Sequence, residues 1–170
     1  MTPQEMDKEL TLILEDKMNS LGFTKKPIHE FCRKVNDCEQ YFSFYYTRDR
    51  GLPGTYYSMF PTLSFRYSKV DELQCLFMGK EYDKREKGFG TGCKGLYMLV
   101  PGCDSGRYRY CSDNPMSDHA ELLFDDFRNY AFRFMINMIH WIKWKHILIK
   151  IGVITEMVLM LLGIMLTDAA

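Results

Sequence analysis

Apolar and polar residues alternate in two segments of residues 39–67, and this pattern constrains the fold more than any other feature. In Glu39–Tyr46, the side chains on one side of an extended chain are those of Phe42, Phe44 and Tyr46. In Thr62–Tyr67 they are those of Leu63, Phe65 and Tyr67. Because successive side chains of a strand point to opposite faces, both segments fit a sheet with one dry and one solvated face. We expect them at the centre of an antiparallel sheet, with helices before and after them covering the dry face.

Length and composition restrict the class of protein. A chain of 170 residues that is 46% hydrophobic and 15% aromatic is sufficient for one globular domain with a sizeable core. Its 22 basic and 22 acidic residues cancel, so we predict no nucleic-acid partner. The polar segment Met1–Lys8 does not have the pattern of a signal peptide, which favours a cytoplasmic location with reduced thiols.

An N-terminal helix is predicted over Pro3–Leu21. Thr2 and Glu5 have the spacing of a capping box, and Pro3 suits the first helical position. Apolar residues recur at helical spacing at Met6, Leu10, Ile13, Leu14 and Leu21. Gly22 follows, where a residue with a left-handed backbone commonly ends a helix.

Five segments have the composition of strands, and turn-forming residues separate them. They are Glu30–Val35, Cys38–Thr47, Thr62–Ser68, Leu96–Val100 and Arg107–Cys111. In the last of these, Tyr108 and Tyr110 are expected to point inward, with Arg107 and Arg109 facing water. Val70–Met78 fits a short helix or a strand equally well, and Gly79–Gly95 is predicted to be a loop.

A long helix is predicted from residue 118 onward. Asp118 and Glu121 have capping-box spacing, and an apolar stripe follows at Leu123, Phe127, Tyr130, Phe134, Met138 and Trp141. These elements predict an α+β fold: an N-terminal helix, an antiparallel sheet of about five strands, and a long C-terminal helix packed on one face. We expect residues 1–140 to form this single domain and residues 141–170 to form an apolar helical tail.

No motif in the chain indicates a reaction or a cofactor. Gly90–Gly95 matches G-x-G-x-x-G, but a charged run precedes it and a strand-like segment follows, which favours a loop over a nucleotide site. The six cysteines lack the paired spacing of a zinc site. Acidic residues at 121, 125 and 126 are explained by the dipole of the helix that they begin. We predict no catalytic, metal-binding or cofactor-binding residues.

The loop Arg48–Phe60 is the predicted surface for a protein partner. It combines turn-forming residues with arginines and aromatic side chains, which are the residue types that dominate binding energy at protein interfaces. The candidate partner-binding residues are Arg48, Arg50, Tyr56, Tyr57 and Phe60.

The C-terminal tail raises the question of a membrane. Ile147–Leu166 is twenty residues long, about the length that crosses a bilayer, and it is preceded by residues typical of a membrane interface: Trp141, Lys143, Trp144 and Lys145. Its twelve Ile, Leu and Val residues contribute about −4 to −7 kcal/mol to insertion, and Glu156 costs about +2.5 to +3.5. With smaller costs from Lys150, Thr155 and two glycines, the sum is near zero. The tail is therefore either a membrane anchor or a helix that packs on the domain or a partner.

The order of these features resembles a family of small bacterial proteins that contain a domain of unknown function. The resemblance covers about Met6–Met138 and rests on three parts of the chain: Leu21-Gly22-Phe23, the strand with Phe31 and Arg33-Lys34-Val35, and Asp125–Ala131. Some relatives of that type resemble immunity proteins of toxin systems. The resemblance implies a non-catalytic protein whose partner is a toxin, and it supplies no catalytic residues.

Three functions follow from the sequence as hypotheses. The first is a non-catalytic binding protein, most concretely a toxin-neutralising immunity protein in the cytoplasm. The second is an accessory protein tethered to the inner face of a membrane by residues 147–166. The third is a small enzyme of unknown reaction, against which stands the lack of a legible catalytic constellation.

Overall fold

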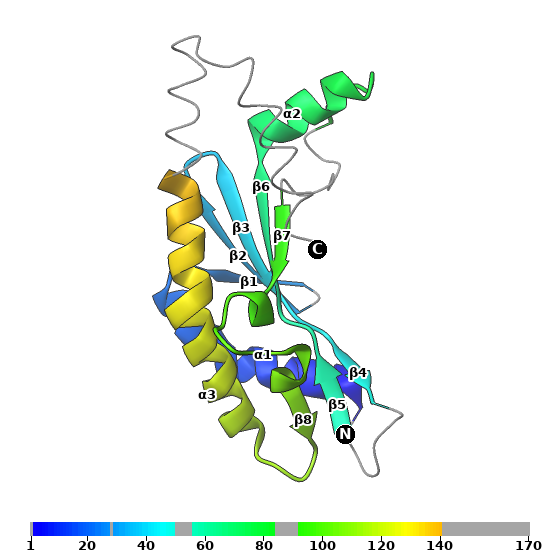
Figure 1. Ribbon diagram of the computed structural model, residues 1–170, viewed down its shortest axis with the longest axis vertical. Coiled ribbons are helices and arrows are strands. Elements are labelled where there is room, and N and C mark those ends of the chain that lie inside the picture. Colours follow the sequence, from blue (N-terminus) through cyan, green and yellow to red (C-terminus); the bar gives the residue numbers. More distant parts are fainter. Residues whose placement is uncertain (1, 28, 50–55, 84–91, 141–170) are drawn as a thin grey trace. The chain divides into compact units, whose positions relative to one another are not determined.

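The computed structural model describes residues 2–27, 29–49, 56–83 and 92–140. The chain divides into two compact units, Met1–Met135 and Ile136–Ala170. The fold described below is that of the first unit. It combines helices with antiparallel sheets, begins with a helix and ends with a helix, which confirms the α+β class (Figure 1).

Helix α1 spans Pro3–Ser20 and begins as the sequence predicts. The Thr2 hydroxyl accepts a hydrogen bond from the Glu5 amide, and the Glu5 carboxylate accepts one from the Thr2 amide at 2.7 Å, so both halves of the capping box are formed. Its fully buried residues are Met6, Leu10, Leu14 and Met18. Gly22 has a φ of +81° after the last turn, as expected for a helix end.

The larger sheet has five antiparallel strands in the order β1-β2-β3-β6-β7. The strands are β1 (Thr24–Lys26), β2 (Glu30–Val35), β3 (Cys38–Ser43), β6 (Thr62–Tyr67) and β7 (Gly92–Gly95). The predicted central pair is β3 and β6, in which Phe42 faces Leu63. The predicted dry face is confirmed, since Phe42, Phe44, Leu63 and Phe65 are all buried.

The smaller sheet has three antiparallel strands in the order β4-β5-β8, which are β4 (Tyr46–Arg48), β5 (Tyr56–Met59) and β8 (Arg109–Cys111). It continues the register of the larger sheet. Ser43 faces Thr62 in β3 and β6, and Tyr46 faces Met59 in β4 and β5, so no residue is inserted or skipped between them. The predicted strand Cys38–Thr47 is thus interrupted only at residues 44 and 45.

Two predicted strands are corrected by the structure: Leu96–Val100 forms no strand, for a clear physical reason, and Arg107–Cys111 is a strand only in part. The Leu96 amide donates to the Pro61 carbonyl at 2.9 Å, but Pro61 has no amide proton to return a bond. The pairing of β7 with β6 therefore ends at Gly95, and Leu96–Met98 forms a 3-10 turn instead of a strand. Ser105–Tyr108 is also a 3-10 turn, and the side chain of Asp104 caps its start by accepting a hydrogen bond from the Gly106 amide. Of the predicted strand Arg107–Cys111, only Arg109–Cys111 therefore pairs in a sheet.

The segment compatible with a helix or a strand is helix α2, Ser68–Phe77. The last helix begins earlier than predicted: α3 spans Met116–Asp126 and its cap is Pro115, without a side-chain hydrogen bond. Because the rigid proline already starts the helix, Asp118 lies within the first turn, where a carboxylate favours the helix dipole.

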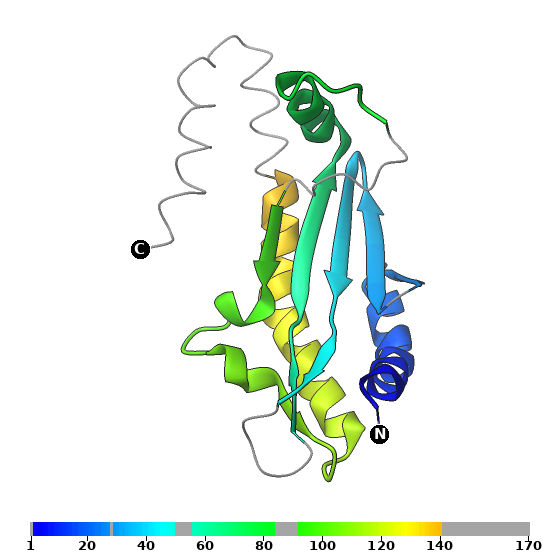
Figure 2. The ribbon, with the colours of Figure 1, turned by 90° about the vertical axis from the view of Figure 1, so that its right-hand side faces the viewer.

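A π-helical turn at Phe127–Ala131 follows α3 directly, and helical structure continues to His140. This wider turn holds an extra residue, so the buried positions become Phe127, Ala131 and Met135, and Tyr130 of the predicted stripe is 37% exposed. Residues 116–135 of this helix lie along the dry face of the larger sheet (Figure 2). Phe127 lies 4.6 Å from Phe42 between ring centroids, and Phe134 lies 5.8 Å from Phe65.

Candidate partner-binding surface

The smaller sheet has one packed side and one solvent-facing side. Directly opposed residues of paired strands share a face. On the packed side, Tyr46, Tyr57, Met59 and Tyr110 are buried. On the other side, Thr47 faces Ser58, which in turn faces Arg109, and Tyr56 faces Cys111. We name this side the outer face; its residues are Tyr45, Thr47, Asp49, Tyr56, Ser58, Phe60, Arg109 and Cys111.

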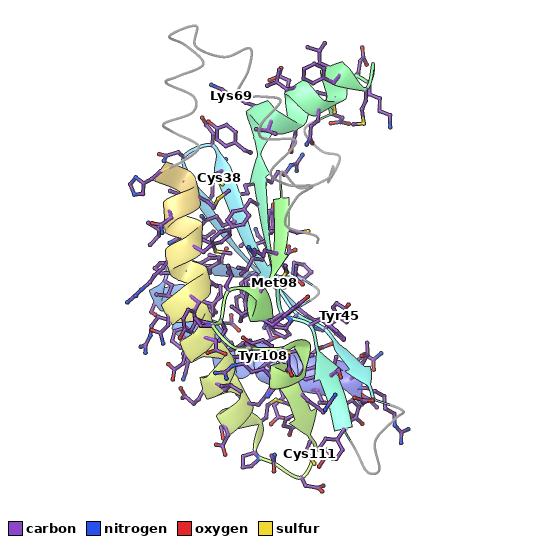
Figure 3. The ribbon with its side chains drawn as sticks, viewed as in Figure 1. Cys38, Tyr45, Lys69, Met98, Tyr108 and Cys111 are labelled. Carbon is purple, nitrogen blue, oxygen red and sulfur yellow. The ribbon has the colours of Figure 1, made fainter. Side chains whose placement is uncertain are left out.

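A stacked aromatic pair lies where the two sheets meet. The rings of Tyr45 and Phe60 are 5.3 Å apart and inclined by only 23°, and the Phe60 amide donates to the Tyr45 carbonyl at 3.1 Å. Tyr45 is 53% exposed although its neighbours Phe44 and Tyr46 are buried. Figure 3 shows Tyr45 on the side of the sheet away from α3. The pair thus adds a flat aromatic surface to the outer face.

A polar frame lies beside the aromatic pair. Arg109 approaches the Asp49 carboxylate at 3.3 Å, and the Ser58 hydroxyl donates to the same oxygen at 3.4 Å. The Asp49 amide donates to the Tyr56 carbonyl at 2.9 Å, which fixes the end of β4 against β5. The Arg109 side chain is 42% exposed, so its guanidinium remains accessible while it is held in position.

The packed side is supported by an aromatic and histidine cluster. The ring of His119 lies 5.2 Å from Tyr110 and 5.9 Å from Tyr46, and the Tyr46 hydroxyl donates to the Met116 sulfur at 3.7 Å. Burial lowers the pKa of His119 to about 4, so the imidazole is neutral at physiological pH. Burial also raises the pKa of Tyr46, so its hydroxyl stays protonated.

A buried carboxylate lies on the same side of the smaller sheet. His29 Nε2 is 3.3 Å from Asp7 Oδ2, and the backbone of Tyr46 also donates to Asp7. Burial raises the pKa of Asp7, and the neighbouring His29 opposes that shift. His29 has a φ of +54°, a conformation that is uncommon for residues other than glycine. These contacts join α1 to the start of β4, so the sheet behind the outer face is fixed from several directions.

The predicted partner-binding residues fall on both sides of the smaller sheet. Tyr56 and Phe60 belong to the outer face and are half-buried, and Arg48 is exposed at the end of β4. Tyr57 points to the packed side and is only 6% exposed, so it supports the surface from behind. Arg50 lies outside the described residues. The partner-binding role of these residues remains a prediction.

Sequence reasoning misses Tyr45 and places Arg109 facing water without connecting it to this surface. The alternation in the sequence does indicate an exposed Tyr45. Successive side chains of a strand point to opposite faces, so Tyr45 points away from the side of Phe44 and Tyr46. Arg109 comes from a distant part of the chain, and its place beside Ser58 depends on the pairing of β8 with β5.

The membrane-interface residues Trp141, Lys143, Trp144 and Lys145, and the segment Ile147–Leu166, lie outside the described residues. Among the residues that the structure does describe, no helix has the length and hydropathy needed to cross a membrane.

The cysteines show no sign of site chemistry in the described part of the chain. All six are free, and burial raises the pKa of the Cys38 thiol to about 11 and that of Cys32 above its usual value. No three His, Cys, Asp or Glu residues with metal-binding geometry occur within the described ranges. Gly92–Gly95 of the glycine motif forms strand β7, and a 3-10 turn follows it where a nucleotide-binding loop would lead into an α-helix.

No protein-family model, no curated protein and no solved structure matches this chain.

Proposed function

We propose that this chain is a non-catalytic protein-binding module whose outer face contacts another protein. The observation that carries the proposal is the stacked Tyr45–Phe60 pair, in which Tyr45 is exposed, beside the accessible Arg109. Aromatic residues and arginine are enriched among the residues that dominate interface energies. The packed reverse side fixes their backbone, so little conformational freedom remains to be lost when a partner binds.

We propose further that the partner is a bacterial toxin, which the chain neutralises in the cytoplasm. Support for this narrower statement comes from the resemblance of Met6–Met138 to small bacterial proteins, some of which resemble immunity proteins. The mixed character of the outer face is compatible with it, since Arg109 and Asp49 supply charge beside an aromatic centre. The apolar segment at 147–166 supports a second form of the proposal, in which a tail helix holds this binding module at the inner face of a membrane.

Site-specific photo-cross-linking tests the binding proposal. A photoreactive amino acid replaces Tyr45 on the outer face or, as the control, Tyr130 on the exposed side of the π-helical turn. In cells of the source organism we expect position 45 to give one discrete protein adduct that position 130 does not give. The adduct is identified by mass spectrometry, so a toxin is distinguished from any other partner.

Binding of the identified partner is then measured with purified proteins. We expect Tyr45→Ala to weaken binding about tenfold or more, as is usual for a central aromatic contact. Tyr130→Ala should leave the dissociation constant unchanged. Equal cross-linking at both positions, or equal affinity of both variants, would show that the outer face is not the binding surface.

A further inference from the structure

The backbone on both sides of Tyr45 is held by two residues that contact each other, Asp7 and His29. The Phe44 amide donates to the His29 carbonyl at 3.3 Å, and the Tyr46 backbone donates to the Asp7 carboxylate. These contacts lie where the chain passes from the larger sheet to the smaller one, between the end of β3 and the start of β4. The path of the backbone through Tyr45 is therefore fixed by α1 and by the connection between β1 and β2.

The Asp7 carboxylate depends on His29 for its compensating charge. Nε2 of His29 lies 3.3 Å from Oδ2 of Asp7, and the exposed fractions of the two side chains are 30% and 7%. Oδ1 of Asp7 is buried and has no hydrogen-bond partner within the part of the chain that the structure describes. A buried carboxylate is unfavourable unless an opposite charge compensates it. Protonated His29 supplies that charge, whereas a neutral imidazole does not.

His29 connects this charge to the backbone beside Tyr45. Its φ of +54° is a left-handed conformation, which histidine adopts more readily than most residues. Its ring lies 6.5 Å from the ring of Phe44, and its carbonyl accepts from the Phe44 amide. Because one residue provides both the side chain that faces Asp7 and the carbonyl that holds Phe44, a change in the Asp7–His29 contact is transmitted to residues 44–46.

The other titratable groups around this cluster do not change charge near neutral pH. An imidazole is the side chain that ordinarily does so between pH 5 and 8. Burial lowers the pKa of His119 to about 4 and raises the pKa of Tyr46 and of Tyr110, so these three groups keep one protonation state between pH 6 and pH 8. They lie on α3, β4 and β8. The carboxylates that α1 and β2 add to this region, whose negative charge also favours a protonated imidazole, are those of Glu9 and Glu30.

We propose that the Asp7–His29 pair is a pH-dependent switch that regulates the outer face. Protonation of His29 strengthens its contact with the Asp7 carboxylate, which restrains the backbone of residues 44–46 and orders Tyr45 for its partner. The restraint is present at pH 6, where His29 gains a proton, and it is lost as the pH rises toward 8. The role of Tyr45 as a partner contact rests on the proposed function, but the switch itself does not.

Amide hydrogen exchange of the full chain at pH 6 and pH 8 tests the switch. After correction for the intrinsic exchange rates, protection of the Phe44 and Tyr46 amides should be about three- to fivefold higher at pH 6, because the contact is then charge-assisted but partly exposed. The Asp49 amide, which donates to the Tyr56 carbonyl at 2.9 Å in the same sheet, is the internal control and should not gain this protection. It also reports any change in global stability that His119 causes.

Two variants remove the switch, and a third is the matched control. His29→Asn removes the titratable group and introduces a residue that also adopts left-handed conformations. Asp7→Asn keeps the shape of the carboxylate and removes its charge. In both, protection of the amides at positions 44 and 46 should be equal at pH 6 and pH 8. Glu15→Gln should keep the full pH dependence, because the Lys25–Glu15 pair joins α1 to β1 at 3.1 Å but is more than one-third exposed on both sides.

A fluorine label tests the connection to the outer face. 4-Fluorophenylalanine replaces Tyr45 or, as the control, Tyr130, and its fluorine NMR resonance is followed from pH 8 to pH 6. We expect the resonance at position 45 to shift with pH and to stay constant when His29→Asn is added, whereas the resonance at position 130 should not shift. Protection at positions 44 and 46 that does not depend on pH, or a resonance at position 45 that behaves identically with and without His29, would overturn the proposal. Neither measurement involves a partner, so their failure is distinguishable from a failure of the proposed binding, which the cross-linking tests.

Discussion

The carboxylate of Asp126 accepts both guanidinium hydrogen bonds that Arg107 directs to it, at 2.6 and 3.0 Å. The hydroxyl of Tyr108, a fully buried residue, donates to the same carboxylate at 2.9 Å. Asp126 itself is buried at the end of α3. One side chain therefore attaches the 3-10 turn that leads into β8 to the helix that covers the sheet.

Asp126→Ala should destabilise the fold by about 2–4 kcal/mol, because it leaves a buried hydroxyl and a half-buried guanidinium without their acceptor. The neighbouring Asp125 provides the control. Its pair with Arg128 is more than half exposed on both sides, so Asp125→Ala should change stability by about 0.5 kcal/mol or less. Urea unfolding followed by circular dichroism measures both variants. If both variants lost the same free energy of unfolding, the hydrogen bonds of Asp126 would stabilise the fold no more than a surface ion pair does.

His119 should make the fold sensitive to acid. Burial lowers its pKa in the folded state to about 4 from the ordinary 6.5, so the folded protein favours the neutral imidazole. The contribution of the neutral His119 to the free energy of unfolding is fully present above pH 6.5, and it is lost as the pH falls from 6.5 toward 4. The loss reaches about 3 kcal/mol once both states bind the proton. Asp7, whose pKa is raised, acts in the opposite direction at low pH, because its protonated form is favoured in the fold.

The two effects are separated by His119→Phe, which keeps an aromatic ring against Tyr46 and Tyr110. The free energy of unfolding of this variant should vary less between pH 7 and pH 4 than that of the unmodified chain. Urea midpoints measured across that range give the difference directly. Parallel pH profiles for the two proteins would contradict the assignment of the acid sensitivity to His119.

Features determined by neighbouring residues could be predicted from the sequence. The capping box of Thr2 and Glu5, the left-handed Gly22 and the alternation of Phe42 and Phe44 each depend on a few adjacent positions, and the structure confirms them. Strand β2 has the predicted bounds, Glu30–Val35, for the same reason.

Features that depend on distant pairing could not be predicted. The strand expected at Leu96–Val100 does not form, because pairing with β6 stops at Pro61, which lies far away in the sequence but opposite Leu96. The sequence pattern places Tyr57 in an exposed loop, and its burial follows from pairing with Tyr110. In the candidate surface, the position of Arg109 beside Ser58 likewise results from the pairing of β8 with β5. The π-helical turn makes Ala131 the buried position in place of Tyr130. A prediction that assumes 3.6 residues per turn throughout the helix cannot anticipate this change.

Gly22 should tolerate substitution poorly, and the size of the effect should follow the backbone preference of the new residue. At a φ of +81°, a side chain with a Cβ atom is strained, so Gly22→Ala should cost about 1–2 kcal/mol. Asparagine adopts left-handed conformations more readily, and Gly22→Asn should cost less. A Cβ atom at this position would lie 3.4 Å from Arg33 Cδ, an ordinary contact, so crowding does not explain a loss. Urea unfolding measures the order, and a larger loss for Asn than for Ala would contradict the backbone explanation.

Gln40 is a fully buried amide that joins β3 to the helix covering the sheet. Its side-chain oxygen accepts from Arg33 at 2.6 and 3.0 Å, and its nitrogen donates to the Met135 carbonyl at 2.9 Å. The Arg33 guanidinium lies over the rings of Phe23 and Phe132, at 5.1 and 4.6 Å from their centroids. Gln40 therefore supplies two of the three hydrogen bonds of this cation, and the Leu21 carbonyl accepts the third at 3.3 Å.

Gln40→Met keeps the length of this side chain and removes every side-chain hydrogen bond of Gln40. We expect a loss of about 2–3 kcal/mol, because the half-buried Arg33 guanidinium keeps only the Leu21 carbonyl as an acceptor and the Met135 carbonyl loses a donor. Gln74→Met on α2 makes the same chemical change at a partly exposed position and should have an effect of about 0.5 kcal/mol or less. Hydrogen exchange of the Met135 region should accelerate in the first variant only. If Gln40→Met is as stable as Gln74→Met, apolar packing alone holds the helix on the sheet, and the buried amide is not required.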